Sequence, residues 1–295
     1  MHDVSRHVNL SATLSTSSDV APGPLTVTLD SNALAAVVSP ETSQGGWGPA
    51  AASVRSSIQD GRVRAFFSET HITLEGIQAK SRADTLGKTR LVSGSTSTSP
   101  RQITLTIAME HFRAPLDRRF AERVREARAL GIWPLRTAMR MCWYHLPSED
   151  LYQPAGGIGE LVQCMEKVNT LSNEIAKRGV GYARAVELGM RFADQSNPNR
   201  PTLWTTGLKV AEPNEVRRAI AEWSDGDGIA AHYGFGVQLF CTQDEGKSSG
   251  KSVLDAENRQ WLTEEYGIEF VTLAELARRV TQCVNRRAIL TRFGV

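Results

Sequence analysis

The fold is decided by residues 225–244, which read Asp-Gly-Asp-Gly-Ile-Ala-Ala-His-Tyr-Gly-Phe-Gly-Val-Gln-Leu-Phe-Cys-Thr-Gln-Asp. This pattern predicts an acidic turn, a short helix, a glycine break and a buried strand that ends in an acid. Residues 25–32, Leu-Thr-Val-Thr-Leu-Asp-Ser-Asn, also close an apolar strand with an acid. Because open α/β folds bind ligands at the carboxyl ends of their strands, both stretches point to a site at one sheet edge.

The composition is that of a globular chain. Its 295 residues are 41% hydrophobic and 22% charged, enough for one large domain or two small ones. The net charge of +2 selects no partner, but residues 113–140 carry eight arginines against three acids. Such a segment attracts phosphate backbones, and it is equally typical of the solvated face of an amphipathic helix.

The four cysteines lie far apart and form no C-x-x-C pair, which disfavours structural zinc and a disulfide framework. We therefore expect a reducing, cytoplasmic compartment. No apolar window reaches the length of a transmembrane helix. Residues 1–24 predict a disordered tail, and residues 283–295 a C-terminal tail.

Strand and helix signals alternate along the chain, which indicates an α/β fold with a parallel sheet covered by helices on both faces. The segment 81–101 is rich in Ser and Thr and predicts a loop. The expected strands are 25–30, 63–67, 103–109, 132–137, 237–241 and 267–271.

Four acids stand at strand ends or in first turns of helices: Asp30, Glu75, Asp225 and Asp244. A single acid in such a place is more often a turn former or a helix cap than a ligand. Four together would repel one another and raise their pKa values, a cost that a divalent cation removes. Oxygen ligands suit Mg²⁺ or Mn²⁺, and these ions support the hydrolysis of phosphodiester bonds.

The order of five blocks resembles that of PIN-domain ribonucleases. Asp30-Ser-Asn32-Ala-Leu is similar to their D-x-N-x-L opening, and residues 225–232 are similar to their third-acid helix, D-x-x-H-I-A. The remaining blocks are the second strand and its helix, the T-x-D that ends the fourth strand, and the closing strand and helix, at 66–75, 240–244 and 267–276. The resemblance covers about half of the chain, roughly residues 25–80 and 210–280.

The resemblance implies a PIN-like three-layer α/β/α fold with a central parallel sheet at residues 25–282. Its core would be about 25–80 and 210–282, with a largely helical insertion at about 85–205. It implies a Mg²⁺- or Mn²⁺-dependent endoribonuclease whose substrate is RNA. Many members are toxins of toxin–antitoxin pairs, so an antitoxin protein and a homodimer are candidate partners, with no membrane partner.

The resemblance also assigns roles to the acids and their neighbours. Asp30, Glu75 and Asp225 would hold the metal, and Asp244 would be a further ligand or an acid behind the ligands. Asn32 would orient Asp30 or the substrate, and Thr242 would support the site by hydrogen bonding. Two alternatives remain: Asp227 could replace Asp225 as the third acid, and Glu69 could replace Glu75 as the second.

The expected phosphate contacts are Arg118, Arg119, Lys247 and Lys251. Two other functions compete with a nuclease. One is a catalytically inactive PIN-like module that binds RNA or protein through the insertion and the arginine-rich segment. The other is a nucleotide-binding enzyme, which is disfavoured because the glycines at 246–252 are one residue short of a phosphate-binding loop.

Overall fold

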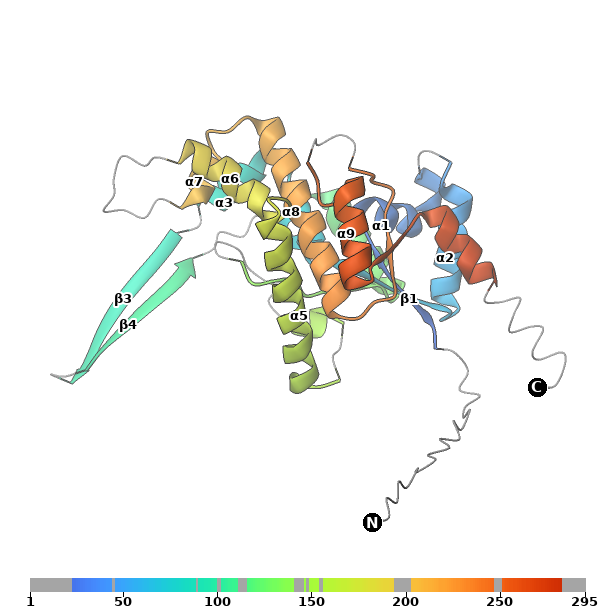
Figure 1. Ribbon diagram of the computed structural model, residues 1–295, viewed down its shortest axis with the longest axis horizontal. Coiled ribbons are helices and arrows are strands. Elements are labelled where there is room, and N and C mark those ends of the chain that lie inside the picture. Colours follow the sequence, from blue (N-terminus) through green and yellow to red (C-terminus); the bar gives the residue numbers. More distant parts are fainter. Residues whose placement is uncertain are drawn as a thin grey trace, which may run out of the picture.

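The computed structural model describes most of the chain between residues 23 and 282 (Figure 1). The predicted tails fall almost wholly outside it, as does Lys247. Residues 90–99 and 102–110 are described by their backbone alone. The described residues are 23–43, 46–88, 90–99, 102–110, 116–140, 146, 149–153, 156–193, 203–246 and 251–282.

A five-stranded, all-parallel sheet forms the centre, in the order β5-β2-β1-β6-β7. In register, Val27 of β1 lies between Ala65 of β2 and Leu239 of β6. The predicted parallel α/β sheet is therefore confirmed. The strands are β1 (Leu25–Leu29), β2 (Val63–Ser68), β5 (Trp133–Leu135), β6 (Leu239–Cys241) and β7 (Glu269–Val271).

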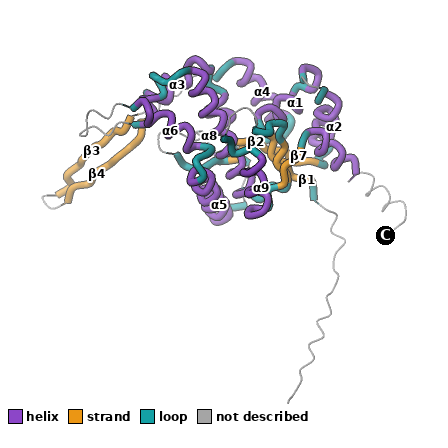
Figure 2. Tube along the Cα trace, turned by 45° about the horizontal axis from the view of Figure 1, so that its top comes forward, coloured by secondary structure: helices purple, strands orange, loops and turns teal. Residues whose placement is uncertain are grey.

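Helices cover both faces of the sheet (Figure 2). Phe66 and Phe67 are successive residues of β2, so they point to opposite faces and enter different apolar clusters. The cluster around Phe67 includes residues of α1 (Ser31–Val38), α2 (Gly48–Gln59), α4 (Arg118–Ala129) and the helical run 273–282. The clusters on the other face include residues of α5 (Ile158–Lys177), α8 (Pro213–Gly234) and α9 (Ala256–Tyr266). The arrangement is a three-layer α/β/α fold.

The acidic turn and short helix expected at 225–232 are wrong, because these residues lie within the long helix α8. It is one continuous helix of 22 residues that begins at Pro213. Glycine disfavours a helix interior, but burial of α8 against the sheet outweighs that preference. Gly226 has a packing reason as well, because a Cβ there would lie 2.9 Å from the Cα of Gly181.

The predicted loop at 81–101 is also wrong. Helix α3 (Ala79–Gly87) and strand β3 (Arg90–Ser99) occupy this segment, and β3 pairs antiparallel with β4 (Gln102–Glu110). Ser and Thr have ordinary strand propensity once a partner supplies backbone hydrogen bonds, which the sequence of one strand does not show. The strand expected at 103–109 is confirmed, but it belongs to this two-stranded ribbon, which extends away from the other layers (Figures 1 and 2).

The segment 85–205 is mostly helical but also supplies β5 to the central sheet. Its helices α6 (Tyr182–Phe192) and α7 (Trp204–Gly207) pack with α3 and α8 around a separate apolar cluster that contains Trp204 and Trp223. Three short helical turns complete the described elements: η1 (Pro40–Thr42), the π-helix η2 (His71–Glu75) and η3 (Glu149–Leu151).

Candidate functional site

The strand order reverses at β1, since β2 and β5 lie on one side of it and β6 and β7 on the other. In open parallel sheets such a reversal leaves a crevice at the carboxyl ends of the two strands involved, and ligands bind there. Asp30 directly follows β1 and Thr242 directly follows β6. The topology therefore places both residues at the edge where a site is expected.

Asp30 is buried and fixed by two hydrogen bonds. As the N-cap of α1, it accepts one from the backbone N–H of Ala33 at 2.7 Å. The hydroxyl of Thr242 donates the other and accepts one from the backbone N–H of Asp244 at 3.0 Å. Burial raises the pKa of Asp30, and these two bonds partly oppose the rise. Thr242 thus connects two of the predicted acids.

Glu75 is the last residue of the π-helix η2, which follows β2. Short π-helical turns are frequent at functional sites. The next residue, Gly76, has no room for a side chain, because a Cβ would lie 2.9 Å from atoms of Leu116 and Phe120. The backbone N–H of Asp117 also donates to the carbonyl of Gly76 at 2.7 Å. Close packing against the start of α4 therefore sets where η2 ends and Glu75 lies.

Asp225 brings the predicted acids together electrostatically. Burial raises its pKa well above the ordinary value, and the charges of Glu75, Glu222, Asp30 and Asp244 raise it further. Four separate elements or loops supply the predicted acids, so their proximity is a property of the tertiary fold.

Two of these carboxylates are without local partners. Within the described part of the chain, no side-chain hydrogen bond or ion pair engages Asp225 or Glu75. Asp244 is exposed and accepts a hydrogen bond from the backbone N–H of Gly246 at 2.8 Å. Positive groups also lie near these acids, since the charge of Glu75 acts on Arg82 and the charges of Asp244 and Asp30 act on Arg259. Repulsion among the carboxylates around Asp225 still favours a bound cation.

The donor set has the chemistry of a hard-cation site, since its atoms are carboxylate oxygens. As the side chains are placed, however, no three His, Cys, Asp or Glu residues among those described are grouped closely enough to hold a metal ion. The acids act on one another through their charges without forming a closed coordination shell.

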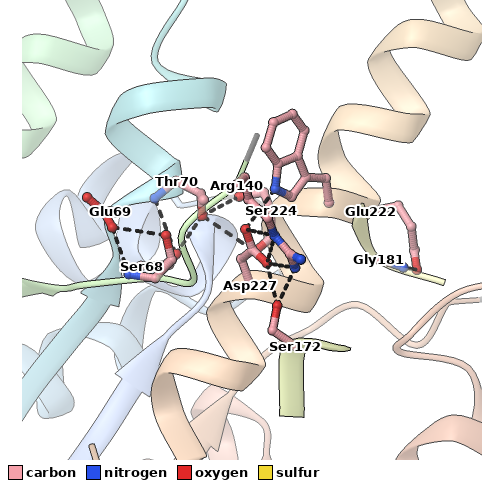
Figure 3. Close-up of polar contacts among 11 residues, drawn as sticks. Ser68, Glu69, Thr70, Arg140, Ser172, Gly181, Glu222, Ser224 and Asp227 are labelled. Atoms are coloured by element: carbon pink, nitrogen blue, oxygen red, sulfur yellow. Dashed lines mark hydrogen bonds and ion pairs between the residues drawn. The ribbon is translucent and has the colours of Figure 1, made fainter. Parts of the chain in front are cut away.

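Asp227 points to a different set of partners, among them Arg140 and Ser172 (Figure 3). Its buried carboxylate pairs with the Arg140 guanidinium and accepts hydrogen bonds from the Trp223 Nε1–H at 2.7 Å and from the Ser172 hydroxyl at 3.3 Å. Residues two apart on an α-helix lie on roughly opposite sides. Asp225 therefore lies on the side of α8 where the other acids act on it, whereas Asp227 connects α8 to α5.

Glu69 is fully engaged elsewhere. Its buried carboxylate accepts hydrogen bonds from the backbone N–H of Thr137 at 2.7 Å, from the Thr137 hydroxyl at 2.9 Å and from the Tyr152 hydroxyl. Burial, followed by the charge of Glu69, raises the pKa of Tyr152. Glu69 thus links the ends of β2 and β5, and its oxygens are committed to that link.

The predicted basic contacts lie in two places. Arg118 and Arg119 are exposed in the first turn of α4, beside the Gly76 segment, and Arg118 pairs with Glu122 at 3.0 Å. Lys251 is exposed and lines a pocket of about 110 Å³ between α6 and α8, together with Arg218. Asn32 is exposed in the first turn of α1, two residues after Asp30.

Sequence reasoning missed two residues near the acids. Glu222 is buried and accepts hydrogen bonds from the backbone N–H groups of Gly181 at 2.9 Å and Val253 at 2.7 Å (Figure 3). His71 is buried, its Nδ1 has no hydrogen-bond partner in the described part of the chain, and its charge lowers the pKa of Asp30. The available signal was helical spacing, because His71 precedes Glu75 by four residues and Glu222 precedes Asp225 by three.

Comparison of the chain with family models, with curated proteins and with solved structures gives no match. Among the helices that the structure describes, each is too short or too polar to cross a membrane.

Proposed function

We propose that this chain is a PIN-like endoribonuclease that depends on Mg²⁺ or Mn²⁺ and hydrolyses RNA phosphodiester bonds. One observation carries the proposal: the charge of Asp225 is coupled to those of Asp30, Glu75 and Asp244, near the carboxyl ends of the strands where the strand order reverses. Carboxylates that repel one another in such a place are costly, and a bound cation removes that cost.

Each residue has a distinct task in this proposal. Asp30, Glu75 and Asp225 would hold the cation, and Asp244 would complete the negative charge at the mouth of the site. When bound, Mg²⁺ or Mn²⁺ supplies charge that activates water and stabilises the phosphate oxygens. Thr242 keeps the Asp30 carboxylate oriented through its hydrogen bond. We also propose that Arg118 and Arg119 attract the RNA backbone.

The direct experiment is cleavage of a labelled RNA by the purified chain with Mg²⁺, with Mn²⁺ or with EDTA. Cutting should require the metal, and Asp30→Asn and Asp225→Asn should each reduce it by more than about 100-fold. Asp60→Asn is the matched control, because Asp60 is an exposed acid at the end of α2, and this variant should cut normally. Unchanged cutting by the Asp30→Asn and Asp244→Asn variants would refute the assignment.

A catalytically inactive RNA-binding module is the second candidate, and the lack of a closed ligand group among the described residues favours it. Calorimetric titration with Mn²⁺ separates the two functions. A nuclease should bind the ion and lose that binding in Asp225→Asn, whereas a binding module should retain RNA affinity without binding the ion.

The biological setting is part of the proposal as well. We place the chain in the cytoplasm, where RNA is available, with an antitoxin protein and a second copy of the chain as candidate partners. Co-purification of a small protein encoded beside this chain, together with release of cleavage when that protein is removed, would support the toxin role. Full activity in the presence of every neighbouring gene product would argue for a housekeeping nuclease.

A further inference from the structure

A hollow of about 260 Å³ lies beside α1, and none of the four predicted acids is part of its lining. It is bounded by α1, by the loop after it, by the start of α2 and by α4. Besides two alanines of α1, its lining consists of Asn32, Ser39, Thr42, Ser43, Trp47 and Arg123. An aromatic ring, a cation, an amide and hydroxyl groups are thus gathered around one small space.

Several of these groups have unused binding capacity. The Ser43 hydroxyl is buried and finds no hydrogen-bond partner among the residues that the structure describes. Arg123 has no carboxylate partner among the described residues, and its guanidinium lies 5.9 Å from the Phe120 ring centroid. Trp47 is half-buried, with its side chain packed against the cluster around Phe67. A buried polar atom without a partner is uncommon and calls for a ligand or water.

One end of the hollow lies close to Asp30 along α1. Asp30 caps α1, and Asn32, which lines the hollow, follows it two residues later in the first turn. From there the lining follows α1 to Ser39, a distance of roughly 12 Å for a helix of eight residues. A chain whose backbone lies at the acids could therefore place a neighbouring group in the hollow.

The combination matches an unstacked nucleobase. Proteins bind the bases of single-stranded RNA by stacking them on aromatic or guanidinium planes and by hydrogen bonding to their polar edges. Trp47 and Arg123 supply the planes, while Asn32 and Ser43 supply hydrogen-bonding groups. A duplex cannot present a base in this way without unpairing.

We propose that this hollow binds one nucleobase of a single-stranded RNA whose backbone lies at the acid crevice. The inference rests on the proposed ribonuclease function and narrows its substrate to single-stranded RNA. It assigns Trp47 and Arg123 to substrate binding, with no part in holding the cation.

The test measures binding in EDTA, so that it does not depend on cleavage. A short single-stranded RNA that contains one 2-aminopurine should show quenched fluorescence when that base stacks on Trp47. Trp47→Leu should remove the quenching and weaken binding by about tenfold, while Trp47→Phe should restore most of both. Arg123→Gln should weaken binding as well, whereas Arg125→Gln, on an exposed position of α4 outside the hollow, should not.

Thermal unfolding of each variant should confirm that it remains folded. Equal binding by wild type, Trp47→Leu and Arg123→Gln would overturn the inference even if RNA is cleaved. Trp47-dependent binding without cleavage would support the inference and refute the nuclease. Preference for duplex RNA, or for adenosine monophosphate over the oligonucleotide, would also overturn it.

Discussion

Asp225 and Asp227 lie two residues apart on α8, and replacing each by alanine should have opposite consequences. The side chains of Asp227 and Arg140 are only 1% and 8% exposed, so Asp227→Ala would leave a buried guanidinium without its counter-charge. It would also leave the Trp223 Nε1–H without its acceptor. Removing one partner of a buried ion pair costs about 3–5 kcal/mol of unfolding free energy.

Urea unfolding followed by tryptophan fluorescence and circular dichroism measures this loss. With an m-value of about 3 kcal/mol per M, the midpoint for Asp227→Ala should fall by roughly 1–2 M while m stays constant. Asp225→Ala should leave the midpoint unchanged or raise it, because ionised Asp225 is disfavoured by burial and by neighbouring carboxylates. Cleavage should be lost in Asp225→Ala although the protein is stable.

A double variant sharpens the comparison. Replacing both charged residues, with Asp227→Leu and Arg140→Met, should recover most of the lost stability, because an apolar pair of similar volume often matches a buried ion pair. A loss below about 1 kcal/mol for Asp227→Ala would refute the structural role of that residue. Destabilisation by Asp225→Ala equal to that of Asp227→Ala would show that the two faces of α8 have been assigned wrongly.

Two further predictions concern packing and pH. Gly226→Ala should cost about 1–3 kcal/mol, because its Cβ would meet the Gly181 backbone at 2.9 Å, whereas Gly228→Ala, with its nearest atom at 3.4 Å, should be tolerated. The two urea midpoints decide this, and equal midpoints would contradict the close approach. Burial lowers the pKa of His232 from 6.5 to about 3, so the unfolded chain binds the proton first and stability falls as pH drops through this range. The stability difference between wild type and His232→Gln should change by up to about 1.4 kcal/mol per pH unit between those values, and a constant difference would contradict it.

Local signals predicted the elements on which the site is built. Apolar residues that stop at an acid identified β1 and its end, because strand preference and helix capping act over a few residues. The same holds for Thr272, which caps the last helix. Its hydroxyl accepts from the backbone N–H of Glu275 at 3.2 Å, and the Glu275 carboxylate accepts from the Thr272 N–H at 2.8 Å.

The ribbon β3–β4 shows where such signals fail. The segment 90–99 has little apolar periodicity, and its strand conformation depends on pairing with 102–110. Pairing supplies backbone hydrogen bonds that no property of one segment reveals. The prediction of a turn in the acidic part of α8 was wrong for the same reason. Contact with the sheet and with Gly181 stabilises a helix that its glycines disfavour.

The sequence by itself determined the parallel α/β class and the positions of acids at strand ends, since both follow from short-range patterns. The tertiary structure decided which acids meet. It brought the charges of Asp225 and Asp30 close enough to act on each other, and it paired Asp227 with Arg140, which lies 87 residues away along the chain. It also committed Glu69 to Thr137. A carboxylate's role depends on the charges and donors that packing brings to it, and those partners come from distant segments whose approach only the complete fold fixes.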